Sequence, residues 1–103
     1  MAKIPKTLEI LGHTVEVRLV KTTQYQGECD YKNNEIRIAN SYKASNQAST
    51  LLHEVLHMIF GKTELFKIVP STLEETVVSN LETGLFQIIR DNPKFVEYIM
   101  EAK

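Results

Sequence analysis

The first part of the chain alternates polar and apolar residues, a pattern typical of half-buried β-strands. Four stretches show it: residues 7–11, 14–20, 27–31 and 35–39. Gly12-His13 separates the first two stretches, and residues 32–34, with two asparagines, separate the last two. Asparagine and glycine accept the left-handed backbone of tight turns, so the pattern predicts two β-hairpins, each with one buried face.

Longer stretches with an apolar residue every three to four positions follow, which is the spacing of amphipathic helices. The first helix is expected from about residue 44 or 46 to residue 60, where Gly61 stops it. A second helix is expected over residues 71–90, and Pro93 is typical of the first turn of a third, shorter one. Phe95, Val96 and Ile99 could dock this last helix on the core, or the helix could lie near the cleft and restrict access to it.

Strands followed by helices indicate an α+β fold. The chain has 103 residues, which suits one domain over residues 1–103 with a single modest core. The expected architecture is an N-terminal sheet of three or four strands packed on the first helix, followed by two further helices.

The composition argues against several classes of partner. The formal net charge is −1, so nothing general attracts nucleic acid or anionic lipid. No segment approaches the ~20 apolar residues that span a bilayer, and the N-terminus lacks the apolar stretch of a signal peptide. Cys29 is the single cysteine, so no internal disulfide can form. We therefore expect a cytoplasmic protein, monomeric or a small homo-oligomer, that binds neither nucleic acid nor membrane.

The predicted first helix contains His53-Glu54-Val55-Leu56-His57, an HExxH sequence. Residues four apart lie on the same face of a helix, so both imidazoles can bind one metal ion, and Glu54 can be the base that activates a water. This is the signature of zinc metallopeptidases. The other side of the helix is apolar and comprises Leu51, Leu52, Val55, Leu56, Met58, Ile59 and, at its edge, Phe60.

A simpler interpretation is that the polar side of this helix is only the solvated face of an amphipathic helix. That interpretation leaves the presence of two histidines and a glutamate on one stripe to chance. Gly61 continues the stripe one turn beyond His57. A residue without a side chain leaves room there for a ligand or for another segment of the chain.

A catalytic zinc site usually has three protein ligands, so a third is needed. On the helix predicted over residues 71–90, Glu74 falls at the middle of the apolar face and Glu75 at its border. A carboxylate in a buried face is costly unless it is paired or bound to a metal, which favours Glu74 as the ligand and leaves Glu75 as the main alternative. Ser71-x-x-Glu74 also fits a capping box, in which Glu74 would only bond the backbone at the helix start.

The HEVLH of residues 53–57, with a glutamate on the next helix, resembles the gluzincin clan of zinc metallopeptidases. Glu74-x-x-Val77-Val78 is similar to the stretch that carries the third ligand in that clan, although Val78 stands where the clan has Asp or Asn. The small size and the pairing of HEVLH with LEETVV resemble small phage and prophage metallopeptidases of the ImmA/IrrE group and minigluzincins. The likeness covers about residues 27–90.

This resemblance implies a zincin-like fold and a Zn²⁺ ion held by His53, His57 and Glu74. It implies hydrolysis of peptide bonds in a peptide or protein substrate, with Glu54 as general base and then general acid. In zincins the edge strand nearest the metal pairs with the extended substrate, a part that residues 34–39 would play here. The expected substrate-binding residues are Glu35, Ile36, Arg37 and Ile38.

Three further points follow from the residues. A hydroxyl that stabilises the oxyanion could come from any of four tyrosines, Tyr25, Tyr31, Tyr42 and Tyr98. Cys29 is expected to be a reduced, half-buried strand residue rather than a metal ligand of the kind that peptide deformylases use. The alternative function is a catalytically silent or latent protein-binding module with a zincin fold. Intact Glu54 argues against it, since a structural zinc site needs no base.

Overall fold

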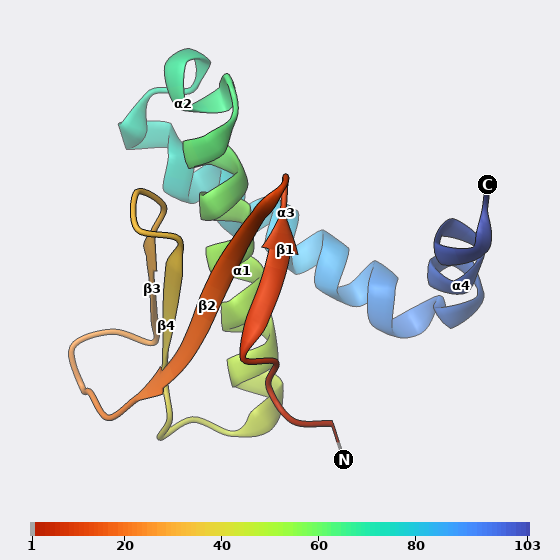
Figure 1. The fold of residues 1–103 in the computed structure, drawn as a ribbon, viewed down its shortest axis with the longest axis horizontal. Helices are drawn as coiled ribbons and strands as arrows, with labels where there is room; N and C mark the ends of the chain where they lie inside the picture. Colours follow the sequence, from red (N-terminus) through yellow and green to blue (C-terminus); the bar gives the residue numbers. More distant parts are fainter. Residues whose placement is uncertain (1) are drawn as a thin grey trace.

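The computed structural model describes residues 2–103 and shows a four-stranded mixed sheet with four helices (Figure 1). The strands are β1 (Thr7–Ile10), β2 (His13–Val20), β3 (Gly27–Asp30) and β4 (Glu35–Ala39). Their order in the sheet is β1-β2-β4-β3. The α+β class expected from the order of the elements is therefore confirmed.

Both predicted hairpins form. β1 pairs antiparallel with β2, and β3 pairs antiparallel with β4. The turn residues have the left-handed backbone that the sequence predicts: φ is 82° at Gly12 and 54° at Asn34, and Leu11 also has a positive φ of 51°. The two hairpins then join through a parallel pairing of β2 with β4.

The expectation that residues 34–39 form an edge strand is wrong. β4 lies between β2 and β3, and its residues Ile36 and Ile38 have no exposed surface. The parallel pairing of the hairpins covers β4 on its second side, which suits a strand with several apolar residues. The edge strand on this side of the sheet is β3, so Glu35, Ile36, Arg37 and Ile38 cannot receive a substrate by strand addition.

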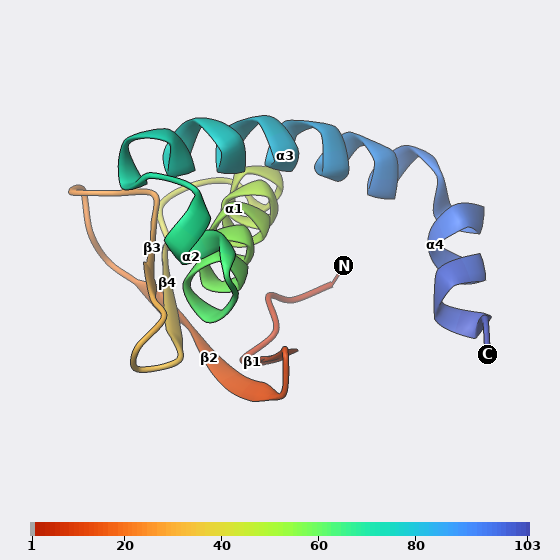
Figure 2. The ribbon, with the colours of Figure 1, turned by 90° about the horizontal axis from the view of Figure 1, so that it is seen from above.

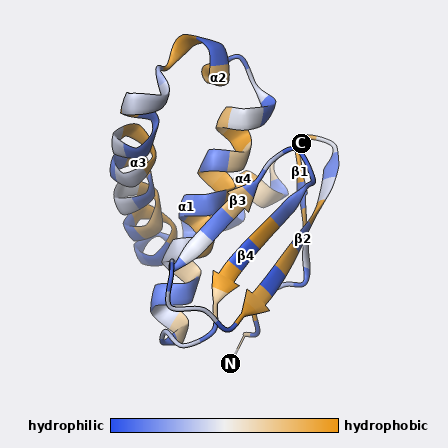
Figure 3. Cartoon of the chain, turned by 90° about the vertical axis from the view of Figure 1, so that its left-hand side faces the viewer, coloured by the Kyte–Doolittle hydropathy of each residue, from blue (hydrophilic) through white to orange (hydrophobic). Residues whose placement is uncertain are grey.

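The helices are α1 (Ala44–Lys62), α2 (Leu65–Ile68), α3 (Ser71–Asp91) and α4 (Pro93–Glu101). The short α2 is not expected from the sequence, and α1 continues through Gly61 for two residues beyond its predicted end. Figure 3 shows α1 between the sheet and α3, so the body has three layers. No helix in residues 2–103 combines the length and the apolar character needed to cross a membrane.

Two apolar clusters meet on α1. Met58 is fully buried in the main cluster, whose other buried members come from the sheet: Ile10, Val15, Val17, Ile36 and Ile38. Leu56 and Phe60 pack instead with the fully buried Val78 of α3. The apolar side of α1 that the sequence predicts as one face is thus shared between the sheet and α3.

The last helix does not dock on the core, which was one of the two placements that the sequence leaves open. α4 contacts α3, while Phe95 and Ile99 remain 52% and 57% exposed. With 21 residues, α3 is about 31 Å long and carries α4 beyond the end of α1 (Figure 2).

Gly61 permits the close approach of the β3–β4 turn to α1. A Cβ atom added at Gly61 would collide with the ring of Tyr31. Of the two uses that the sequence leaves open for this glycine, room for a ligand or for another chain segment, the structure shows the second. Lys62 reinforces the contact, since its Nζ donates a hydrogen bond to the Tyr31 carbonyl oxygen at 3.1 Å.

We expect Gly61→Ala to destabilise the fold by about 1–3 kcal/mol, because an added methyl group in a packed contact displaces the Tyr31 ring. Gly84→Ala is the matched control, since Gly84 is also helical and a Cβ there meets nothing within 4 Å. Gly84→Ala should stabilise the fold by about 0.5–1 kcal/mol through helix propensity alone. Urea unfolding of both variants measures the two changes in the free energy of unfolding. Equal changes at the two positions would contradict the close contact between Gly61 and Tyr31.

Candidate metal centre

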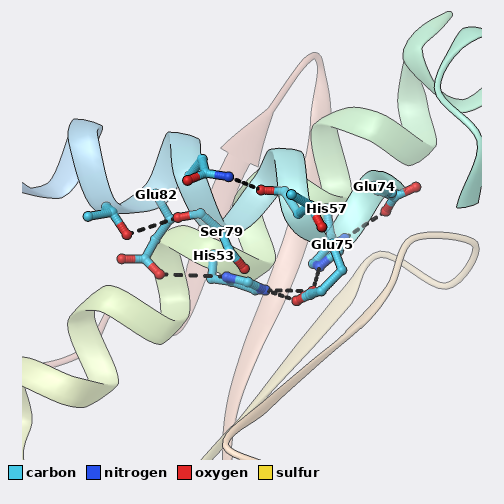
Figure 4. Close-up of polar contacts among 9 residues, drawn as sticks. His53, His57, Glu74, Glu75, Ser79 and Glu82 are labelled. Carbon is cyan, nitrogen blue, oxygen red and sulfur yellow. Dashed lines mark hydrogen bonds and ion pairs between the residues drawn. The ribbon is translucent and has the colours of Figure 1, made fainter. Parts of the chain in front are cut away.

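The two histidines of the HExxH sequence lie side by side on α1. Their ring centroids are 4.9 Å apart, and the rings meet edge to face. Both side chains are partly buried, 17% exposed for His53 and 20% for His57. Figure 4 shows that both rings face the first turns of α3. The i, i+4 spacing therefore places the imidazoles as the sequence predicts.

One carboxylate of α3 contacts both rings. Glu75 Oε1 lies 2.6 Å from His53 Nε2, and Glu75 Oε2 lies 3.2 Å from His57 Nε2 (Figure 4). One ligand atom from each of His53, His57 and Glu75 falls within 4.8 Å of the others. Two imidazole nitrogens and a carboxylate thus converge on one point between α1 and α3.

The second nitrogen of each ring faces another carboxylate. Glu74 Oε2 is 2.6 Å from His57 Nδ1, and Glu82 Oε1 is 3.6 Å from His53 Nδ1. Of these two contacts only the one between His57 and Glu74 is a hydrogen bond, in which Nδ1 donates to the carboxylate. In a metal site, a proton held on Nδ1 leaves the lone pair of Nε2 for the metal. The Nε2 atoms of both histidines thus face Glu75, while their Nδ1 atoms face Glu74 and Glu82.

The geometry favours Glu75 over Glu74 as the third ligand, the reverse of the preference drawn from the sequence. That preference assumed that the apolar face of the second long helix is buried with Glu74 at its middle. Val78 is the one buried residue of α3, so the assumption of a buried face does not hold. The capping box is absent as well, because no side chain caps α3 and the Glu74 carboxylate bonds His57 instead.

Glu82 is a site residue that the sequence analysis missed. It lies seven residues after Glu75, two turns along the same side of α3. Its side chain is 20% exposed, far less than the 61% of Glu75. The helical spacing between Glu75 and Glu82 could have pointed to Glu82. It does so only when α3 is known to pack against the side of α1 that carries the histidines.

Glu54 is the most buried charged residue of the site, at 7% exposed. Its carboxylate has no hydrogen bond or ion pair with any residue in the described part of the chain. Burial raises the pKa of Glu54 above its ordinary value, although His57 and His53 oppose this shift. The carboxylate oxygens are not themselves enclosed, because Glu54 lines two cavities. A carboxyl group whose pKa is shifted in this way is typical of functional sites.

The backbone of β3 makes room for Glu54. A Cβ added at Gly27 would come within 3.1 Å of Glu54 Cγ and Oε2 and closer still to Thr50. Gly27 therefore allows the edge strand to pass directly over Glu54.

Two cavities adjoin the site, of about 290 and 370 Å³, and Gly27, Glu54 and Glu75 line both. The larger of these two also touches Tyr31 and Cys29. Among the four candidate tyrosines, the structure thus brings Tyr31 to the site, whereas Tyr98 is 71% exposed on α4. The substrate-binding residues expected on β4 do not line either cavity.

Cys29 is half-buried in β3, as the sequence predicts. Burial, with Glu54 as the next cause, raises the pKa of its thiol to about 12. The thiol is therefore protonated at neutral pH in the metal-free protein. Cys29 does not belong to the group of ligand atoms formed by His53, His57 and Glu75.

His57 has a pKa that its surroundings push in two directions. Burial lowers it, but the hydrogen bonds that the His57 ring donates to Glu74 and Glu75 and the charge of Glu54 raise it, so the net shift is upward. The metal-free protein therefore holds a proton at this ring more firmly than a free histidine does. A metal ion that binds here would compete with that proton.

No protein-family model matches the chain, and searches of curated proteins and of solved structures return no significant match. The arguments about function accordingly rest on the geometry of the site.

We expect Glu54→Gln to stabilise the metal-free protein at pH 7 by about 1 kcal/mol, or about 4–8 °C in Tm. Burial raises the pKa of Glu54 in the folded state above its ordinary 4.5. Ionisation therefore destabilises the fold as the pH rises through the folded pKa, and glutamine removes that charge without changing the shape of the side chain.

The gain should vanish at about pH 4, where the carboxyl group is protonated in both the folded and the unfolded state. Thermal unfolding followed by circular dichroism in the presence of a chelator measures it. Glu16→Gln on the exposed side of β2 is the control, with an expected change below about 0.5 kcal/mol. A loss of stability at pH 7 in Glu54→Gln would mean that the charge of Glu54 has a stabilising partner.

Proposed function

We propose that this protein is a zinc-dependent metallopeptidase in which His53, His57 and Glu75 bind the metal and Glu54 is the catalytic base. One observation carries the proposal. The Nε2 atoms of both histidines and the carboxylate of Glu75 converge beside a buried glutamate that has no partner among residues 2–103. Two histidines and one glutamate form a common ligand set of catalytic zinc sites, which leave a position open.

The distances between these ligand atoms fit a metal ion closely. Ligand atoms about 2.0–2.1 Å from a tetrahedral zinc ion lie about 3.3 Å from one another. The His57 Nε2–Glu75 Oε2 separation of 3.2 Å meets this requirement as it stands. The same Oε2 atom lies 3.2 Å from His53 Nε2, so one carboxylate oxygen of Glu75 meets the requirement for both histidines.

Glu74 and Glu82 support the proposal as positioning residues. Metal-binding histidines usually donate their other ring N–H to a carboxylate, which fixes the tautomer and the ring orientation. Glu74 stands at this place for His57 and Glu82 for His53. A solvated polar face of a helix has no need of a separate carboxylate at each Nδ1 atom.

The proposed mechanism divides the chemistry between the metal and Glu54. Zinc held by His53, His57 and Glu75 would polarise a peptide carbonyl and lower the pKa of a water molecule towards ~7. Glu54 accepts the proton of that water and later donates it to the nitrogen of the departing amine. In the metal-free protein burial raises the pKa of Glu54, which suits a carboxyl group that both accepts and returns a proton.

The substrate is proposed to bind along β3. This strand is at the edge of the sheet, and Gly27, Glu28 and Cys29 line the cavity of about 370 Å³ that also contains Glu54 and His57. An extended peptide can add to a free strand edge through backbone hydrogen bonds. Tyr31 lines the same cavity and is the tyrosine we propose as hydroxyl donor to the oxyanion.

The ligand assignment predicts an order of metal affinities. Glu75→Ala should weaken zinc binding by about 100-fold or more, whereas Glu74→Ala, which removes only a positioning carboxylate, should weaken it by about 10–100-fold. Glu64→Ala, at an exposed glutamate just before α2, should have no effect.

Isothermal titration of metal-free protein with Zn²⁺ measures all three variants against the wild type, which should bind about one ion per chain. A greater loss in Glu74→Ala than in Glu75→Ala would restore Glu74 as the ligand. A wild type that binds no zinc would remove the basis of the proposal.

Glu54→Gln is expected to keep zinc affinity within about threefold while lowering peptide hydrolysis by at least about 100-fold, since it removes the proton acceptor. The assay is digestion of a peptide mixture by the zinc-loaded protein, followed by mass spectrometry. Equal cleavage by wild type and Glu54→Gln would exclude Glu54 as the base. A zinc-loaded wild type that cleaves no peptide would favour the silent or latent binding module instead.

A further inference from the structure

The C-terminal half of α3 and the whole of α4, residues 81–101, form an arm. Glu82 at its base still contacts His53 of α1, and the rest of the arm extends beyond the three-layered body (Figure 2). Large apolar side chains cover much of its surface. Eight of them are 36–80% exposed: Leu81, Leu85, Ile88, Ile89, Phe95, Tyr98, Ile99 and Met100. Within the chain α4 packs only against α3 among the elements it contacts closely.

The exposed apolar surface of the arm is large for an isolated domain. Eight large apolar side chains within residues 81–100 are each at least 36% exposed, and single protein chains rarely expose connected apolar patches of more than a few hundred Å². An arm with such a surface is suited to pack against a partner.

The apolar residues also form helical stripes. Leu81, Leu85 and Ile88 follow the i, i+4, i+7 spacing on α3, and Phe95 and Ile99 follow i, i+4 on α4. The polar residues of α3 in this region, Thr83, Gln87 and Arg90, project from the opposite side of the helix. A two-sided pattern of this kind is typical of helices that pack against another element. The body of the same chain provides no such element for this part of α3 and for α4.

The body carries a hollow that has no occupant among residues 2–103. It measures about 830 Å³ and lies between the N-terminal segment, β2 and the first turn of α1. We call it the N-terminal hollow; it is lined by residues 2–7 and 16–19 and by Gln47. Leu19 of β2 is 47% exposed there. The hollow is remote from the histidines, none of which line it.

The charges of the arm and the hollow are complementary. The hollow has three basic residues, Lys3, Lys6 and Arg18, and one acidic residue, Glu16. Arg18 is already paired with Glu35 of β4 at 3.3 Å, so the free positive charge comes from Lys3 and Lys6. α4 has two acidic residues, Glu97 and Glu101, and one basic residue, Lys94. Opposite net charges on two surfaces favour their association and set its orientation.

We propose that the occupant of the N-terminal hollow is α4 of a second copy of this chain, so that two copies exchange their arms and form a symmetric dimer. Each copy has one arm and one hollow, so each can bind the arm of the other. Such a reciprocal contact uses both binding surfaces of both copies and gives a closed dimer. It covers the apolar stripes of both arms and places Glu97 and Glu101 near the basic residues of the hollow.

Sedimentation velocity at about 1–100 μM protein tests the dimer. The wild type should sediment as a dimer, with twice the 11.8 kDa mass of one chain. The double change Leu85→Glu with Ile99→Glu should give a monomer. Thr83→Glu with Lys94→Glu adds charges of the same sign to the polar side of the same two helices and should remain dimeric. All four positions are exposed, and circular dichroism checks that each variant stays folded.

A disulfide experiment tests which surfaces meet. In a Cys29→Ser background, chains with Ile99→Cys are mixed with differently tagged chains that carry Leu19→Cys, and the mixture is oxidised. The proposal predicts cross-links between the two kinds of chain. Cross-links only between Ile99→Cys chains would show arm against arm and overturn the assignment to the hollow. A wild type that is monomeric throughout, or a dimer that survives both glutamates, would overturn the proposal itself.

Discussion

The packing of Val78 against α1 is the contact on which the candidate metal centre depends. Val78 has no exposed surface and lies with Leu56 and Phe60 between the two helices. Positions 74, 75 and 82 fall within about 60° of Val78 around the axis of α3. Once Val78 is buried against α1, three glutamates must face α1, and the histidines occupy the adjacent side of that helix.

The same packing concentrates negative charge. Four carboxylates, those of Glu54, Glu74, Glu75 and Glu82, surround two imidazoles. Burial raises the pKa of Glu54, and neighbouring carboxylates raise the pKa of His57. Both pKa shifts favour proton binding, at Glu54 and at His57, and so reduce the excess negative charge. A divalent cation would reduce it further. The ionised form of Glu54 is therefore unfavourable in the metal-free protein, whereas the carboxylates beside His57 favour its protonated form. A divalent cation could take the place of that proton.

The sequence predicts those parts of the fold and the site that depend on neighbouring residues. Both hairpins, the helix with HExxH and the helix over residues 71–90 follow from alternation, helical spacing and turn residues, and the structure confirms them. The inner position of β4 could not be predicted, because it depends on a parallel pairing between two hairpins that are separate in the chain. The exposed arm was missed for a related reason, since an apolar stripe does not indicate which molecule covers it.

The choice between Glu74 and Glu75 shows the same limit within the site. Adjacent residues on a helix differ by about 100° in direction, so the choice depends on how α3 is rotated against α1. That rotation is set by one buried valine rather than by the apolar face as a whole, and the sequence gives Val78 no greater weight than Leu81 or Leu85. In the structure both glutamates contact the histidines, Glu75 at the Nε2 atoms and Glu74 at an Nδ1 atom.

X-ray absorption at the zinc edge of the zinc-loaded protein tests the central claim most directly. The account predicts two imidazole nitrogens and carboxylate oxygen at about 2.0–2.2 Å, with one imidazole lost in His57→Ala and carboxylate oxygen lost in Glu75→Ala. A sulfur neighbour at about 2.3 Å would instead place Cys29 on the metal. A spectrum without imidazole nitrogens would contradict the account of the site.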